Sequence, residues 1–334
     1  MAKKIEEVTK DFWDNEVDAV NKMLIEEFLQ QQHLSAQTLK QYESSLKIFA
    51  KWVNDFCIAP RGEKKKIYDL KPRDALKYQN WLISKGLSPN AIKFKRSSVS
   101  SLCGYIEVFY SDEYPEFRNI FTKAIPNVAK SNVKEKQPLT TKEIETLIKE
   151  LEKRKEWQKL AYVLFTYITG CRREEARQLL KEVITYSKHL DKKTNEEKPY
   201  YLTHVIRAKG KGKVGKERKF KFDDKAMEAI KKWIDYRTEQ VEEDNCLYVF
   251  ASKTKGGYKQ ISPNTFNLWC EEFSEILGGR PVHPHLFRSS RATNAVIEDG
   301  KDIKAVQKLL GHNSSQTTEI YVVRDDVDDD DDLF

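Results

Sequence analysis

Apolar residues recur at helical spacing through the first third of the chain, from residue 17 to residue 110. The first such stretch runs from Val20 to Leu29, with apolar positions three and four residues apart. Three more stretches begin near Ser35, Pro72 and Ser88, and these residue types favour the first turn of a helix. Four helices joined by short loops predict a small helical bundle.

The periodic pattern stops and then restarts before the middle of the chain. Residues 124–138 are rich in lysine, proline and asparagine and poor in apolar residues, which is typical of a linker. Thr140 and Glu143 have the spacing of a capping box and predict the start of a helix. Residues 161–168 are apolar on nearly all sides, which predicts a buried helix.

Residues 200–222 follow a different pattern. The segments Y-Y-L-T-H-V-I-R and R-K-F-K-F are rich in strand-forming residues, and the basic, glycine-rich segment K-G-K-G-K-V-G-K lies between them. This arrangement predicts a β-hairpin with a basic tip. Helices are then expected at residues 224–239, 263–277, 285–298 and 303–310.

The predicted fold is therefore mainly α, with two domains and one small antiparallel sheet in the second. A chain of 334 residues is comfortable for two domains. The expected parts are an N-terminal extension at 1–16, a helical domain at 17–123, a linker at 124–138, a second domain at 139–324, and an acidic tail at 325–334.

The charge of the chain favours a polyanionic partner. The formal net charge is +7, and it becomes +14 when the seven aspartates of residues 325–334, a stretch with no basic residue, are set aside. The tail is expected to be disordered, and it either keeps the chain soluble or folds back over a basic surface and competes with the partner.

Several classes of protein are disfavoured by composition. No apolar run approaches the roughly eighteen residues of a membrane span, and no secretion signal is evident. The five cysteines are scattered, with no C-x-x-C pair, so we expect neither a disulfide framework nor a zinc cluster. A reducing cytoplasm, with the cysteines as small buried residues, is the expectation.

Candidate chemistry begins at two arginines. Arg172 ends the segment T-G-C-R, and Glu175, three positions on, is placed to pair with it. His285 and Arg288 stand three apart on one face of a predicted helix. An arginine can fork two N–H groups onto a phosphate, although a surface salt bridge is an equally ordinary use for Arg172.

His312 and Tyr321 complete the candidate set. His312 ends L-L-G-H, and Tyr321 follows nine residues later. Taken singly, each histidine is more often structural than catalytic, and Tyr321 suits a half-buried strand position. The histidine spacing does not match H-x-x-x-H, and no carboxylate or cysteine cluster accompanies it, so we expect no metal site. Together the side chains suit a site that holds a phosphate, moves protons and supplies an oxygen nucleophile.

These motifs, taken in order, resemble the tyrosine recombinases of the phage-integrase family. The matching segments are T-G-C-R-R-E-E (169–175), K-G-K-G-K-V-G-K-E-R (209–218), H-L-F-R-S-S-R-A-T (285–293) and L-L-G-H-N-S-S-Q-T-T-E-I-Y (309–321). Residues 17–110 are similar to the core-binding, DNA-binding domain of that family, and P-L-T-T-K-E-I resembles the start of its catalytic domain. Ser289 departs from the pattern, because many relatives carry a histidine there.

The resemblance implies a role for each candidate. Arg172 and Arg288 would clamp the scissile phosphate, His285 and His312 would handle protons, and Tyr321 would attack phosphorus to leave a 3′-phosphotyrosine bond. A hairpin lysine, either Lys209 or Lys211, would protonate the departing 5′ oxygen. Glu175 would support Arg172. The covalent intermediate keeps the bond energy, so no cofactor is implied.

The resemblance also implies double-stranded DNA as partner. Expected contacts with its backbone are Ser35, Thr38, Lys40, Lys93, Lys95, Arg96, Lys213 and Lys216. For the residues on helices, a solvated helix face is an equally good explanation. Recombination of two duplexes implies a homotetramer on paired sites, with a monomer or dimer when free. Accessory DNA-bending proteins and a nucleoid-associated place in a bacterial cytoplasm are expected.

Two functions fit this set of residues. The first is a site-specific recombinase of the integrase type. The second is a regulator or repressor of a phage or mobile element that keeps the fold and binds DNA without cutting it. The full set of candidate catalytic residues favours the first, and the acidic tail keeps the second open.

Overall fold

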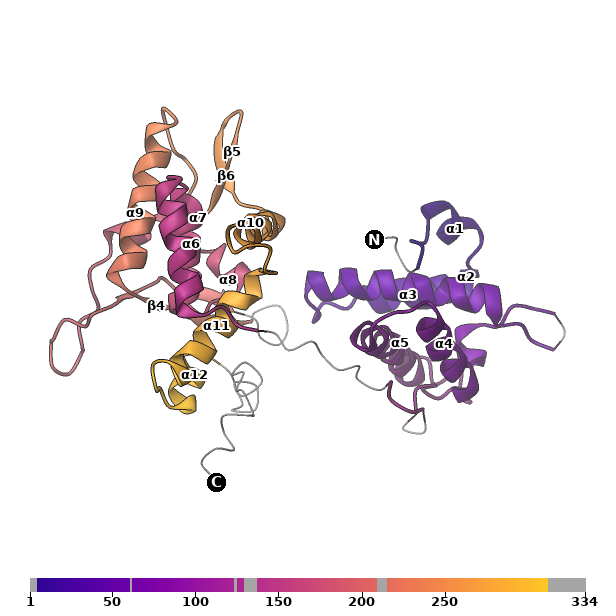
Figure 1. Ribbon diagram of the computed structural model, residues 1–334. Coiled ribbons are helices and arrows are strands. Elements are labelled where there is room, and N and C mark those ends of the chain that lie inside the picture. The colour runs from indigo at the N-terminus through magenta and orange to yellow at the C-terminus, as the bar shows by residue number, and fades with distance from the viewer. Residues whose placement is uncertain (1–4, 61, 123–124, 129–136, 209–214, 312–334) are drawn as a thin grey trace, which may run out of the picture. The chain divides into compact units, whose positions relative to one another are not determined.

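A computed structural model describes residues 5–60, 62–122, 125–128, 137–208 and 215–311 (Figure 1). The chain divides into two compact units, residues 1–134 and 135–334. The boundary falls within the stretch that has linker composition. Within the described residues the fold is mainly helical, with three two-stranded antiparallel sheets. The predicted fold class is confirmed.

The helices of the N-terminal unit begin where their caps predict. The elements are α1 (Lys10–Asn15), α2 (Ala19–Leu29), α3 (Ala36–Phe56), the 3₁₀ turn η1 (Ile67–Asp69), α4 (Pro72–Ser84) and α5 (Pro89–Phe109). Ser35 Oγ accepts a hydrogen bond from the Thr38 amide at 3.2 Å, and Ser88 Oγ accepts one from the Ala91 amide at 3.3 Å. Gly86 follows α4 with a φ of 67°, as a helix-ending glycine does.

Helix α1 differs from the sequence-based expectation, which placed residues 1–16 in an extension. Trp13 is only 6% exposed and belongs to the same apolar core as Leu24 and Phe49. Its indole N–H donates to Glu26 Oε1 at 3.3 Å. A helix of six residues holds too few apolar positions to show a period, so the sequence pattern did not reveal it.

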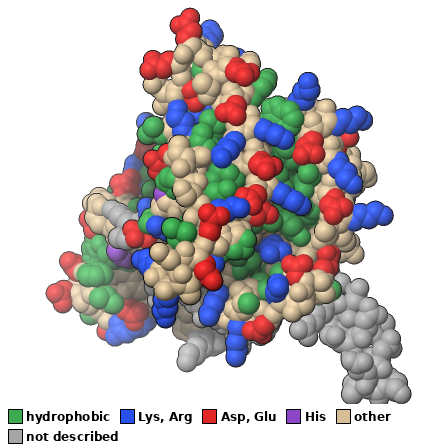
Figure 2. Space-filling model, turned by 90° about the vertical axis from the view of Figure 1, so that its left-hand side faces the viewer, with side chains coloured by type: hydrophobic (Ala, Val, Ile, Leu, Met, Phe, Trp, Pro, Cys, Tyr) green, Lys and Arg blue, Asp and Glu red, His purple; other side chains and the backbone are tan. Residues whose placement is uncertain are grey.

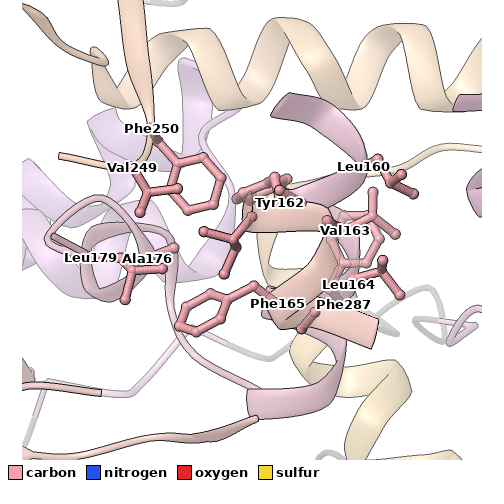
Figure 3. Packing of buried hydrophobic residues seen from close by; sticks show 14 of the residues in the cluster. Leu160, Tyr162, Val163, Leu164, Phe165, Ala176, Leu179, Val249, Phe250 and Phe287 are labelled. Atoms are coloured by element: carbon pink, nitrogen blue, oxygen red, sulfur yellow. The ribbon is translucent and has the colours of Figure 1, made fainter. Parts of the chain in front are cut away.

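The C-terminal unit is built around α7 (Trp157–Thr169). In Figure 1 this helix lies beside α6 (Thr141–Lys153), α9 (Asp224–Glu239) and α11 (Pro284–Ile297), and it packs against all three. Figure 3 shows Tyr162 and Phe165 of α7 among the buried side chains of this core. The predicted buried helix at 161–168 is confirmed. The remaining helical elements are α8 (Arg173–Ala176), η2 (Lys181–Thr185), α10 (Pro263–Ile276) and α12 (Ile303–Leu310).

The strands confirm one predicted hairpin and add another. Strand β1 (Tyr201–Leu202) pairs with β4 (Lys221–Phe222), and β2 (Ile206–Ala208) pairs with β3 (Lys216–Arg218), both antiparallel. The tip at 209–214 lies outside the described residues. The unexpected hairpin joins β5 (Ala251–Thr254) to β6 (Gly257–Gln260). Its strands are short and polar, so their alternation of apolar and polar residues is weak.

Candidate active site

Arg172 sits in a tight turn between α7 and α8. Helix α7 ends at Gly170 in the left-handed conformation, and Arg172 is the residue before the first turn of α8. Glu175 accepts from the Arg172 amide at 2.6 Å and from Arg172 Nη1 at 3.0 Å, so the expected pair is present. The Glu175 side chain is 2% exposed and that of Arg172 is 29% exposed. A buried carboxylate therefore holds a guanidinium that reaches the surface.

Arg288 connects this turn with the end of α12. Its side chain is fully buried on α11. Arg288 Nη1 donates to the carbonyl of Gly170 at 2.5 Å, and Nη2 donates to the carbonyl of Leu310 at 2.7 Å. Gly170 precedes Arg172 by two positions and Leu310 precedes His312 by two positions. One guanidinium thus fixes two segments that carry other candidate residues.

His285 lies one turn before Arg288 on α11 and is half-buried. Ser289, where a histidine is common in relatives, is 5% exposed, and its hydroxyl donates to the carbonyl of His285 at 3.4 Å. The Ser289 side chain is therefore buried and hydrogen-bonded within its own helix. His312 and Tyr321 lie outside the described residues, as do Lys209, Lys211 and Lys213.

Arg218 is a residue of this region that the sequence analysis did not single out. It ends β3, and it donates to the carbonyl of Leu310 from Nη1 at 2.6 Å and to the carbonyl of Leu309 from Nη2 at 2.7 Å. Burial lowers the pKa of this guanidinium, as does the charge of Arg172, whereas Glu175 opposes the shift. The sequence places Arg218 in a basic hairpin, but its partners are about ninety residues away.

The DNA contacts expected in the N-terminal unit have different surroundings. Lys40 and Lys93 are exposed. Arg96 donates to the carbonyl of Pro126 at 3.2 Å and lies over the ring of Phe121, and burial lowers the pKa of Lys95. Those two residues pack against their own unit. The hydroxyls of Ser35 and Thr38 are 2.8 Å apart and cap α3; in the other unit, Lys216 is exposed at the start of β3.

One face of the molecule carries mixed charge. On the side drawn in Figure 2, lysine and arginine side chains alternate with aspartate and glutamate side chains. The phosphate backbone of a nucleic acid binds best to a surface on which basic side chains are clustered. The described part of the face in Figure 2 does not have this character.

The described residues contain no group of three or more histidine, cysteine, aspartate or glutamate side chains arranged to hold a metal. All five cysteines are buried, as expected, and each is a free thiol in the structure. Burial raises the pKa of the Cys171 thiol, next to Arg172, to about 12, so it stays protonated at neutral pH. Within the described part of the chain, no helix combines the length and the apolar character needed to span a bilayer.

Replacing Gly170 with alanine is expected to destabilise the protein by about 2–4 kcal/mol. Gly170 has a φ of 59°, and a Cβ there would lie 2.6 Å from Leu310 Cδ2. The strained backbone and the clash act together, since Leu310 is itself held by two arginines. Thermal unfolding followed by circular dichroism measures the loss. Gly256→Ala is the matched control, because a Cβ at Gly256 meets nothing within 4 Å; equal melting temperatures for the two variants would contradict the prediction.

Comparison with known proteins shows which family this chain belongs to. Residues 137–327 match the model of the phage integrase family. The chain belongs to that family. Residues 23–109 match the N-terminal SAM-like domain of phage integrases. The resemblance of the motifs is therefore confirmed, and it extends over both units.

Individual relatives cover most of the chain. It is 30% identical over 327 residues to the SPbeta prophage-derived recombinase-like protein YomM of Bacillus subtilis, covering 96% of this chain and 92% of YomM. It is 31% identical over 255 residues to the tyrosine recombinase XerA of Pyrococcus furiosus, covering 76% and 77%. The solved structure of the XerH site-specific recombinase bound to a palindromic difH substrate is similar in fold, with a TM-score of 0.64, 18% identity, and coverage of 94% and 84%.

Proposed function

We propose that this chain is a site-specific DNA recombinase that cleaves and rejoins DNA through a 3′-phosphotyrosine intermediate on Tyr321. The observation that carries the proposal is the Arg288 guanidinium, which joins the Gly170 turn to the end of α12. Through it, the motifs that carry Arg172, Arg288 and His312 approach one another although they are far apart in the sequence. The similarity to the recombinase-like protein YomM, the tyrosine recombinase XerA and the site-specific recombinase XerH supports the same activity.

The proposed reaction is a transesterification. The Tyr321 hydroxyl attacks phosphorus, so the bond from the tyrosine oxygen to phosphorus forms and the bond to the 5′ oxygen breaks. The leaving oxygen takes a proton from Lys209 or Lys211, and the tyrosine proton passes to His285 or His312. Rejoining is the reverse, with a 5′ hydroxyl as nucleophile.

Two features of the described site suit this reaction. Arg172 and Arg288 stabilise the charge that develops on the non-bridging phosphate oxygens. One carboxylate oxygen of Glu175 accepts from Arg172 Nη1, and the other accepts from the backbone amide of Arg172. Glu175 therefore holds Arg172 in place without occupying all the N–H groups of the guanidinium. The arginine can therefore keep its orientation while other N–H groups meet the phosphate.

The partner in this proposal is double-stranded DNA, and the XerH structure, which is similar in fold, is bound to a palindromic difH substrate. Residues 17–123 are the proposed DNA-binding domain and residues 139–324 the catalytic domain. Exposed Lys40, Lys93 and Lys216, with Lys213 of the hairpin tip, are the proposed backbone contacts. The same proposal implies that the chain assembles as a homotetramer on paired sites. It also implies accessory DNA-bending proteins and association with a bacterial nucleoid.

Covalent capture tests the function. Random duplexes retained by the purified chain define a preferred sequence. Duplexes of that sequence are then nicked beside each phosphate in turn, so that a short fragment with a 5′ hydroxyl diffuses away after cleavage. A protein–DNA band that survives detergent and disappears with protease supports the recombinase. Tight, sequence-specific binding with no such band at any nick position identifies the silent regulator instead.

A further inference from the structure

The C-terminal end of α12 has a hydrogen-bond donor for each of its last four carbonyls. The Gly311 amide donates to the carbonyls of Gln307 and Lys308, at 2.8 and 3.2 Å. The two outermost carbonyls accept from side chains: that of Leu309 from Arg218, and that of Leu310 from both Arg218 and Arg288. A helix end leaves such carbonyls without partners in its own backbone, and cations stabilise them.

Arg218 suits this task because of its shape. Its two terminal nitrogens bind two successive carbonyls, one each, in the fixed planar geometry of a guanidinium, whereas a lysine would have a single nitrogen on a flexible stem for both. The strand that carries it is paired, with Arg218 opposite Ile206. The guanidinium also stacks over the ring of Phe220, 4.7 Å from its centroid, and Phe220 is 2% exposed. Arg218 is thus fixed from the sheet side.

Gly311 is shaped to receive this arginine. Its φ is 66°, and a Cβ at this position would lie 2.6 Å from Arg218 Cζ. Any other residue would push the guanidinium from the helix end. The next residue along the chain is His312. The Arg218 contacts therefore set the place and direction in which the chain leaves α12 toward His312.

We propose that Arg218 is a positioning residue for the reaction, acting with Arg288 to fix the end of α12 and through it His312. This proposal rests on the proposed function in one respect, the assignment of His312 to proton transfer in the reaction. Arg218 differs from Arg172, whose guanidinium pairs with a side chain, because both terminal nitrogens of Arg218 donate to the backbone. These two contacts assign Arg218 to the end of α12.

The first test compares Arg218→Lys with a control, Arg154→Lys, in which the same substitution is made at an exposed arginine directly after α6. Adduct formation is timed on the nicked DNA at saturating protein. We expect Arg218→Lys to slow it by about 10- to 100-fold, with DNA affinity within about threefold of wild type, because an outer contact positions a group without binding substrate. An unchanged rate, or a loss confined to affinity, overturns the proposal.

A double-mutant cycle with His312→Gln separates positioning from a general structural effect. If Arg218 acts through His312, Arg218→Lys slows the His312→Gln variant by less than about threefold, because the group being positioned is gone. Effects that multiply in the double variant show that the two residues act independently and overturn the proposal. Gly311→Asn is the second variant, since asparagine tolerates a positive φ but its Cβ meets Arg218, and it is expected to reproduce the Arg218→Lys rate.

Hydrogen exchange supplies a readout that needs no activity. In the Arg218→Lys variant the peptide covering residues 303–311 is expected to exchange faster by about tenfold or more, while α9 exchanges as in wild type. Equal exchange in the two proteins overturns the proposal. A wild-type chain that forms no adduct on any DNA counts against the recombinase, whereas faster exchange in the variant would still establish that Arg218 holds the helix end.

Discussion

Tyr321→Phe is expected to abolish formation of the covalent protein–DNA adduct while leaving DNA binding intact. The substitution removes one oxygen and keeps the ring, so the shape of the side chain barely changes. Loss of the proposed nucleophile is expected to cost on the order of 10⁴-fold or more in rate, because water or a neighbouring hydroxyl is not held in line with the phosphate. The rate should fall to the detection limit on the nicked DNA that captures the wild-type chain.

The matched control for this prediction is Tyr236→Phe. Tyr236 lies on α9 and is 43% exposed, so removing its hydroxyl should leave both the rate and the affinity unchanged. Binding is measured by fluorescence anisotropy over a series of salt concentrations, since contacts with phosphates make affinity salt-dependent. An adduct that persists in Tyr321→Phe assigns the nucleophile to another residue. If the wild-type chain and Tyr321→Phe both bind DNA and neither forms an adduct, the protein is a regulator.

The sequence predicted local features well because their causes are local. Helix α9 (Asp224–Glu239) and α12 (Ile303–Leu310) have the predicted bounds, since caps and apolar spacing lie within each segment. The β5–β6 hairpin was not predicted, because short polar strands form through pairing with each other and carry little periodic signal. The same limit explains the missed helix α1, which is stabilised by the burial of Trp13.

The candidate site shows the same division. The pairing of Arg172 with Glu175 is predictable, because the two residues stand three positions apart on one turn. The contacts of Arg218 and Arg288 with the carbonyl of Leu310 are not, because they join residues 92 and 22 positions apart. Motif spacing pointed to Arg288 as a phosphate ligand. It gave no sign that this arginine also ties two backbone segments together.

That second role makes Arg288→Lys the next most damaging change. An ammonium cannot reach both the Gly170 and the Leu310 carbonyls in the geometry of a guanidinium. Either the Gly170 carbonyl loses its Arg288 donor, or the Leu310 carbonyl is left with Arg218 alone. Weakening the hydrogen bonds of a buried carbonyl in this way costs about 1–3 kcal/mol. The free energy of unfolding, measured with urea, should fall by that amount. Arg291→Lys, three residues further along α11 and partly exposed, is the control.

The rate of adduct formation should also fall, by about 10²- to 10³-fold, because one of the two guanidinium groups proposed to stabilise the phosphate in the transition state is lost. Measurement well below the melting temperature of the variant, at saturating DNA, keeps this loss apart from unfolding. Loss of stability with an unchanged rate would make Arg288 a structural residue alone. Loss of rate with unchanged stability would mean that its carbonyl contacts contribute nothing. Only the combined loss fits an arginine that binds the backbone and the phosphate together.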